Sequence, residues 1–112
     1  MNGEEQQPGG CACLTSPTPS LMINRQLGMD SRYGEVTLLI CPDCGQIWLR
    51  YFYENEAFSR SGRWYMGPVN PAQIARITAE NAKEILEGMD WYLFGGSYFD
   101  GKTGRSSGNI YL

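Results

Sequence analysis

The strongest constraint on how this chain can fold is a set of four cysteines, arranged as two close pairs far apart in the sequence. Cys11 and Cys13 are separated by one residue, whereas Cys41 and Cys44 are separated by two residues and followed by Gly45. Two close pairs can meet around one cation at low entropic cost, and four soft sulfur ligands suit a tetrahedral ion. The spacing therefore predicts a structural metal site that joins distant parts of the chain.

Length and composition agree with a small domain that gains from such a site. The chain has 112 residues, of which 42% are hydrophobic, and a core of this size is modest. Residues 1–10 are polar and rich in glycine and proline, so we expect a disordered tail there. Residues 11–112 are expected to form a single domain stabilised by the metal.

The sequence also predicts a cytoplasmic protein with no membrane segment. An apolar run of roughly 18 residues, which spanning a bilayer requires, is missing from the sequence, and the N-terminus lacks the features of a secretory signal. Two disulfides would be unusual in a reducing compartment. The cysteines are therefore interpreted as metal ligands or a redox pair before they are interpreted as disulfides.

Charge points to protein partners rather than nucleic acid. The net charge is −3, and no basic stripe runs through the sequence. Affinity for DNA or RNA comes largely from cations that neutralise phosphates, so nucleic-acid binding is disfavoured.

The first two thirds of the chain show strand patterns. Residues 21–28 form a candidate strand, and the polar residues with a glycine at 30–34 favour a turn. Residues 35–40 alternate between apolar and polar positions, as do residues 46–54 after the second cysteine pair. A turn at 59–62 and a strand at 63–66, ended by Gly67 and Pro68, complete three antiparallel strands after the first.

The last third changes to a helical period. Thr78 can cap a helix whose apolar positions are spaced for one face, namely Ala82, Ile85, Leu86 and Met89, with Gly88 at its end. Whether residues 70–77 are helical or extended stays open. Residues 91–99 favour β structure with a bulge or a close backbone approach at Gly95 and Gly96. A turn at 100–104 and a strand at 108–112 would form a C-terminal hairpin.

Together these patterns predict an α+β fold: a small antiparallel sheet with a knuckle-bearing hairpin, one amphipathic helix and a C-terminal β-hairpin. The segment Cys41-Pro42-Asp43-Cys44-Gly45 resembles the zinc knuckle of zinc-ribbon and rubredoxin-like proteins. The resemblance implies a metal held by Cys11, Cys13, Cys41 and Cys44, which joins an N-terminal loop to a β-hairpin. It covers the knuckle and the distant first pair, and the first pair departs from the usual ribbon because only one residue separates its cysteines.

Structural zinc is the leading interpretation of the four cysteines, because a closed four-thiolate site leaves no position for substrate. Iron in the same cage and four unliganded thiols are alternatives. A thiol redox pair at Cys41 and Cys44 is another, although such a motif should open a helix and a strand pattern follows here. The sequence has no histidine, which excludes histidine-based catalysis and disfavours an enzyme.

The many aromatic residues are mostly expected in the core. Trp48 and Phe52 share the mixed face of one strand with Arg50, and Trp, Tyr and Arg are common anchors in protein interfaces. We therefore expect Trp48, Arg50 and Phe52 to contact a partner. The sequence predicts a zinc-stabilised protein-interaction module of the cytoplasm, with an adaptor or immunity-type protein as one version. A thiol redox protein or enzyme that uses Cys41 and Cys44 is the alternative.

Overall fold

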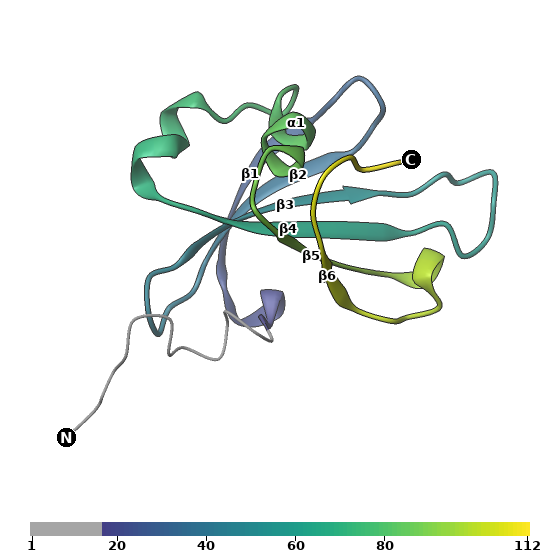
Figure 1. The fold of residues 1–112 in the computed structure, drawn as a ribbon, viewed down its shortest axis with the longest axis horizontal. Coiled ribbons are helices and arrows are strands. Elements are labelled where there is room, and N and C mark those ends of the chain that lie inside the picture. Colours follow the sequence, from purple (N-terminus) through teal and green to yellow (C-terminus); the bar gives the residue numbers. More distant parts are fainter. Residues whose placement is uncertain (1–16) are drawn as a thin grey trace.

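The computed structural model describes residues 17–112, which contain one six-stranded antiparallel sheet (Figure 1). The strands lie side by side in chain order, so the sheet is a meander. Their bounds are β1 Ile23–Met29, β2 Glu35–Ile40, β3 Ile47–Tyr53, β4 Arg63–Val69, β5 Tyr92–Gly95 and β6 Gly104–Ser106. The predicted small α+β fold with an antiparallel sheet is confirmed at this level, and the expected tail at residues 1–10 lies outside the described residues.

The helices are short. The described residues contain one α-helix, α1 Ala82–Glu87, and the 3-10 helices η2 Pro19–Leu21, η3 Pro71–Arg76 and η4 Ser97–Phe99. Within residues 17–112, no helix is long and apolar enough to cross a membrane. Residues 70–77, whose conformation the sequence left open, are mostly helical, because η3 occupies Pro71–Arg76. The N–H of Asn70, the residue before η3, donates a hydrogen bond to Gln73 Oε1 at 2.9 Å.

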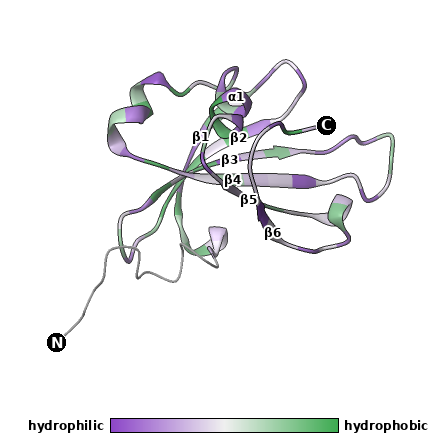
Figure 2. Cartoon of the chain, in the orientation of Figure 1, coloured by the Kyte–Doolittle hydropathy of each residue, from purple (hydrophilic) through white to green (hydrophobic). Residues whose placement is uncertain are grey.

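The predicted amphipathic helix is confirmed, but Thr78 is not its cap: the N-cap residue of α1 is Asn81, three residues later. The Thr78 hydroxyl accepts a hydrogen bond from the Asn81 N–H at 3.2 Å, and the Asn81 side chain accepts one from the Thr78 N–H at 2.8 Å. This reciprocal pair fixes the approach of the chain to α1. Ala82 and Leu86 are buried against the sheet, and Figure 2 shows hydrophilic residues on the same helix.

Alternation along the strands produces two faces with separate apolar clusters. The first face is covered by α1, and its buried members are Val36, Leu38, Leu49, Tyr51, Tyr65, Val69, Ile77, Ala82, Leu86, Tyr92 and Ile110. The second face has a smaller cluster of Met22, Leu39, Cys41, Trp48, Met66 and Leu93, with Trp64 and Trp91 packed against it. Because side chains on a strand point alternately to opposite faces, β3 contributes large buried residues to both clusters.

The turn between β1 and β2 is held by one buried carboxylate. Asp30 accepts hydrogen bonds from the backbone N–H groups of Arg32 (2.9 Å) and Gly34 (2.8 Å) and from the Tyr51 hydroxyl (2.5 Å). Gly34 must be a glycine, since a Cβ at this position would lie 2.2 Å from the Tyr51 ring. The predicted turn at residues 30–34 is confirmed.

The end of β4 differs from the prediction. The strand continues through Gly67 and Pro68 to Val69, where the sequence pattern placed its end at Met66. A proline is tolerated here because β5 pairs with β4 only from Trp64 to Met66, so the missing N–H of Pro68 removes no hydrogen bond to β5. Gly67 leaves room for the side chain of Met89, just after α1, which would have to shift if a Cβ were added here.

The C-terminal hairpin is present but its second strand is not the predicted one. β5 pairs with β6 at Gly104–Ser106, and the expected strand at residues 108–112 is wrong. Two hydrogen bonds hold that segment against the first face instead: Tyr92 donates to Gly108 O (2.9 Å), and the Ile110 N–H donates to Glu87 (2.8 Å).

The connection within this hairpin also differs, because η4 occupies part of the region expected to be extended. Of the two alternatives at Gly95 and Gly96, the close backbone approach is the one found. A Cβ on Gly96 would lie 2.4 Å from the carbonyl oxygen of Gly62, and the φ of Gly96 is +118°. The Tyr98 N–H donates to that same Gly62 oxygen at 2.8 Å. The glycine therefore lets the chain leave β5 and turn into η4 against the start of β4.

Candidate functional site

The cysteine knuckle is the tight loop that connects β2 to β3. Cys41 follows the last residue of β2, and its N–H donates to Gln46 O at 2.9 Å. The Gly45 N–H donates to Cys41 O at 2.8 Å, and Gly45 adopts a φ of +78°. That left-handed conformation favours glycine and lets the loop close within six residues. The segment from Cys41 to Gln46 therefore forms a tight, hydrogen-bonded loop.

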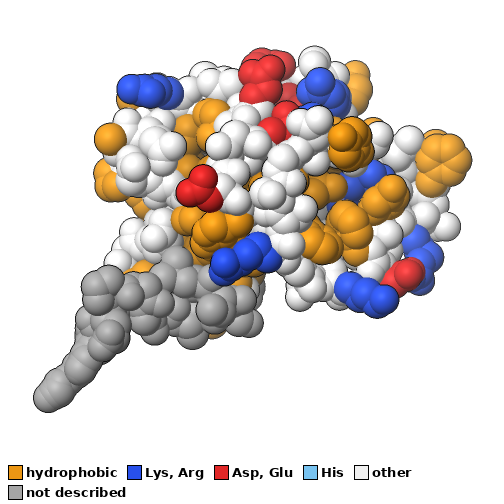
Figure 3. All heavy atoms as spheres, viewed as in Figure 1, with side chains coloured by type: hydrophobic (Ala, Val, Ile, Leu, Met, Phe, Trp, Pro, Cys, Tyr) orange, Lys and Arg blue, Asp and Glu red, His pale blue; other side chains and the backbone are white. Residues whose placement is uncertain are grey.

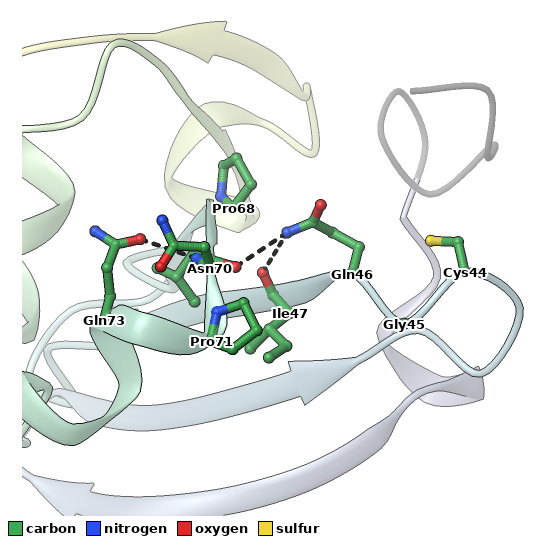
Figure 4. Close-up of a pocket in the computed structure, with 9 residues that line it drawn as sticks. Cys44, Gly45, Gln46, Ile47, Pro68, Asn70, Pro71 and Gln73 are labelled. Atoms are coloured by element: carbon green, nitrogen blue, oxygen red, sulfur yellow. Dashed lines mark hydrogen bonds between the residues drawn. The ribbon is translucent and has the colours of Figure 1, made fainter. Parts of the chain in front are cut away.

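The two described cysteines differ in exposure. Cys41 is buried in the cluster of the second face, with 4% of its surface exposed, whereas Cys44 is exposed at the outer end of the loop (Figure 4). The chain enters β3 three residues after Cys44, at Ile47, so a strand and not a helix follows the pair. Cys11 and Cys13, the other two predicted ligands, lie outside the described residues.

The donor set at the knuckle fits a soft metal ion when it is combined with the distant pair. Within residues 17–112, no group of three or more His, Cys, Asp or Glu side chains is placed to hold a metal. A tetrahedral metal site that used Cys41 and Cys44 would need two further ligands from outside this range, and the sequence analysis predicts Cys11 and Cys13 for that role.

Gln46 ties the knuckle to the end of β4. Its side-chain amide donates to Ile47 O at 2.8 Å and to Val69 O at 3.2 Å. Together with Cys44, Gly45, Asn70 and Gln73, it lines an open hollow of about 430 Å³ beside the knuckle (Figure 4). The backbone near Cys44 is thus anchored to the sheet on the side away from the loop tip.

The three predicted partner-binding residues differ in solvent exposure. Trp48 has 0% of its surface exposed and lies in the core of the second face, so its expected role as a surface anchor is wrong. The alternation of the strand placed Trp48 on the correct face, but Trp91 packs edge-on against it, with ring centroids 6.1 Å apart. The Trp48 indole N–H is buried and finds no hydrogen-bond partner among the residues described.

Arg50 and Phe52 lie on the same face and are half-buried. The Arg50 guanidinium is 5.4 Å from the centre of the Phe52 ring, and Arg50 Nε is buried with no hydrogen-bond partner in the described part of the chain. Burial lowers the pKa of Arg50, and the nearby Glu35 carboxylate opposes that change. The charge of Arg50 is thus held partly out of water without a close acceptor.

A second arginine on this face was not among the predicted partner residues. Strand register aligns Arg50 with Met66, Met66 with Leu93, and Leu93 with Arg105. The guanidinium of Arg105 is exposed and stacks 4.0 Å above the Trp91 ring. We call the cluster of Arg50, Phe52, Trp64, Trp91 and Arg105 on the second face the arginine face. Glu35 and Thr37 of β2 lie beside this cluster, opposite Phe52 and Arg50.

Only some residues of the arginine face could be predicted from the sequence. The period of two along β3 assigns Arg50 and Phe52 to one side, but the contribution of Arg105 depends on the register of β6, which the sequence pattern placed four residues too late. Comparison with family models, with curated proteins and with solved structures finds no match for this chain.

Proposed function

We propose that this chain is a cytoplasmic protein-interaction module stabilised by a structural zinc ion, with iron as the other candidate metal. Cys11, Cys13, Cys41 and Cys44 would hold the ion and so fasten the N-terminal segment to the β2–β3 loop. When bound, the ion supplies folding free energy by cross-linking the two segments. The partner would be another protein, which contacts the arginine face.

The observation that carries the proposal is the backbone of the knuckle. Two thiols stand on a six-residue loop that is closed by the Gly45 N–H and by the left-handed conformation of Gly45. A tight loop of this kind holds both sulfurs in one region, and backbone N–H groups near the first cysteine can donate to its thiolate. The buried position of Cys41 further suits a ligand that belongs to the core.

The arginine face supports the interaction role. Arg50 and Arg105 make no ion pair within residues 17–112, and both stack on aromatic rings that are themselves half-buried. Arginine and aromatic side chains arranged around an apolar floor are typical of the energetically dominant part of protein interfaces. Trp48 supports this floor from below and is not a contact residue in the proposal.

The alternative function is a thiol redox protein or enzyme that uses Cys41 and Cys44. One exposed and one buried cysteine suit an attacking and a resolving thiol, which is the observation in its favour. However, the pair is followed by β3, so no helix dipole lowers the thiol pKa as in thioredoxin-type motifs. The structural interpretation is therefore preferred.

Thiol titration with and without a strong chelator separates the two functions. A metal cage protects all four thiols from an alkylating reagent until the chelator removes the ion, and a redox pair reacts at once in both conditions. Cys44→Ser should lower the melting temperature by about 10 °C or more, since loss of a structural metal removes folding free energy. Melting within a degree or two of the parent would contradict a structural role.

A further inference from the structure

The second face carries charges of opposite sign on its two sides. On the side of β6, the guanidinium of Arg105 is exposed, stacks on Trp91 and makes no ion pair within residues 17–112. On the side of β2, Glu35 is exposed and lies opposite Phe52. Figure 3 shows that basic side chains also gather, together with an acidic one, at the lower right of the molecule, beside the loop that leads to β6.

The acidic side of this face borders a hollow of about 500 Å³ between the β1–β2 turn and the segment that follows β3. We call it the acidic hollow, and its walls include the ring of Phe52 and three carboxylates, those of Glu35, Glu54 and Glu56. None of these carboxylates forms an ion pair with a residue in 17–112. Arg32 also lines the hollow, but its guanidinium pairs with Asp30 at 3.5 Å. The hollow therefore has an excess of negative charge.

The strand order makes this pattern of charges self-complementary. β6 and β2 each lie two strands from β4, on opposite sides of it. A two-fold axis that runs along β4 between two facing sheets therefore places β6 of each copy over β2 of the other. By strand register, Arg105 lies in the same row across the sheet as Thr37, and Glu35 lies two residues away on β2. Two residues of a strand span about 7 Å, a distance that the side chains of Arg and Glu can bridge together.

The centre of such a pair of sheets would be aromatic. Trp64 lies on β4, the strand nearest the axis, and is half-buried. Phe52 on the neighbouring strand β3 and Trp91, just before β5, are half-buried as well. Aromatic residues at the centre with charged residues toward the rim are typical of protein interfaces.

Arg105 can contact a carboxylate without leaving Trp91. A guanidinium that stacks on a ring uses its planar face, so its N–H groups stay available along its edge. Those groups fit the two oxygens of a carboxylate, which a lysine ammonium does not match in the same way. Arg105 therefore has donors for an acidic group that a second molecule brings.

We propose that the protein that contacts the arginine face is a second copy of this chain, with Arg105 of each copy in the acidic hollow of the other. The inference rests on the proposed function, because it names the partner of the same face. Each contact occurs twice in the pair, and the two-fold symmetry closes the assembly at two copies.

Sedimentation equilibrium of the full chain, purified without chelators, tests the proposal. The parent should form a species of twice the chain mass of 12.6 kDa, and added salt should weaken the association because it screens the charges. Arg105→Glu and Glu35→Arg should each raise the dissociation constant of the dimer by about tenfold or more, since each replaces two attractive contacts by two repulsive ones. Arg25→Glu is the matched control, because Arg25 is exposed on β1 in register with Leu38 of the first face, and should leave the dissociation constant unchanged.

Mixing the two charge variants guards against misfolding as the cause. In an equimolar mixture of Arg105→Glu and Glu35→Arg, both contacts again join opposite charges, so a mixed dimer should form with an affinity near that of the parent. A parent that stays monomeric at about 0.1 mM, single variants that dimerise as well as the parent, or variants that do not pair when mixed would each overturn the proposal. A monomeric parent that loses capture of a host protein through Arg50→Met would retain the proposed function and remove only the second copy as the partner.

Discussion

Asp30 shows how one residue can define a turn and connect it to the core. Its side chain is almost completely buried, yet its carboxylate accepts three hydrogen bonds, one of them from the hydroxyl of the fully buried Tyr51. Burial raises the pKa of Asp30, but the bonds from Tyr51, Gly34 and Arg32 outweigh it and leave that pKa below 3.8, the ordinary value. Burial, together with the hydrogen bond to Asp30, raises the pKa of Tyr51.

Asp30→Asn should lower the free energy of unfolding at neutral pH by about 1–3 kcal/mol, the range for hydrogen bonds to a charged group. Because the folded pKa is depressed, this contribution is present above pH 3.8 and is lost as the pH falls through the folded pKa. Urea unfolding of parent and variant at a series of pH values measures the difference. The gap should close in acid, and a gap of constant size would show that the charge of Asp30 is not responsible.

Arg50 is expected to favour binding of the proposed partner while contributing little or nothing to the stability of the fold. Replacing a buried charge that lacks a close acceptor by an apolar side chain is often neutral or stabilising. Arg50→Met should therefore leave the free energy of unfolding unchanged or raise it by about 1 kcal/mol, and should abolish capture of the partner. Arg25→Met, on the exposed strand β1, is the control and should preserve capture.

Chemical unfolding and affinity capture from extracts of the native host, compared by quantitative mass spectrometry, provide the two readouts for Arg50. If Arg50→Met captured the same proteins as Arg25→Met, the arginine face would not be the partner surface. If it unfolded much more easily than the parent, Arg50 would be structural.

Among the elements, the strands and the helix could be predicted well, since each has a clear internal period. Turn residues also marked the loops, and the Asp30–Gly34 turn and the tight loop between β2 and β3 both fall where the sequence placed them. The C-terminal segment could not be predicted in this way. Residues 108–112 end in the apolar run Ile110–Leu112, and their position depends on long-range contacts with Glu87 and Tyr92, which no local pattern contains.

Glu87 is therefore expected to control the order of that segment. Its carboxylate accepts from Lys83 Nζ and from the Ile110 N–H, both at 2.8 Å. Glu87→Ala should lower the free energy of unfolding by about 2 kcal/mol, since a hydrogen bond to a charged group and a helix ion pair are both lost. Hydrogen exchange at the Ile110 amide should quicken markedly, whereas Glu84→Ala, exposed on the same helix, should leave it unchanged. Equal exchange in both variants would contradict the proposed contact.

At the scale of the whole molecule, the sequence predicted which residues share a face but not how deeply each face is covered. Trp48 and Phe52 have the same parity along β3, yet Trp48 is fully buried and Phe52 is not. The difference arises because Trp91, distant in sequence, packs on Trp48. The burial of a strand residue in this sheet thus depends on side chains that are distant in sequence. The exposed residues of the arginine face could therefore be identified only from the structure of the whole sheet.

The two faces of the sheet also differ in the chemistry of their side chains. The arginine face combines cations with rings, whereas the first face carries a cluster of tyrosine and phenylalanine rings beside the C-terminal segment. The knuckle lies at one end of the β2–β3 hairpin, and Asp30 holds the turn near its other end, where β2 begins. A metal at the knuckle would secure that end as Asp30 secures the other.

X-ray absorption at the metal edge, on protein purified without chelators, tests this account most directly. The account predicts one metal ion per chain, surrounded by four sulfur atoms at about 2.3 Å. Cys11→Ser should reduce the sulfur coordination, which would place the N-terminal pair at the knuckle. Protein without a bound metal, or a metal with two sulfur ligands that Cys11→Ser leaves unchanged, would contradict the clamp between the N-terminal segment and the β2–β3 loop.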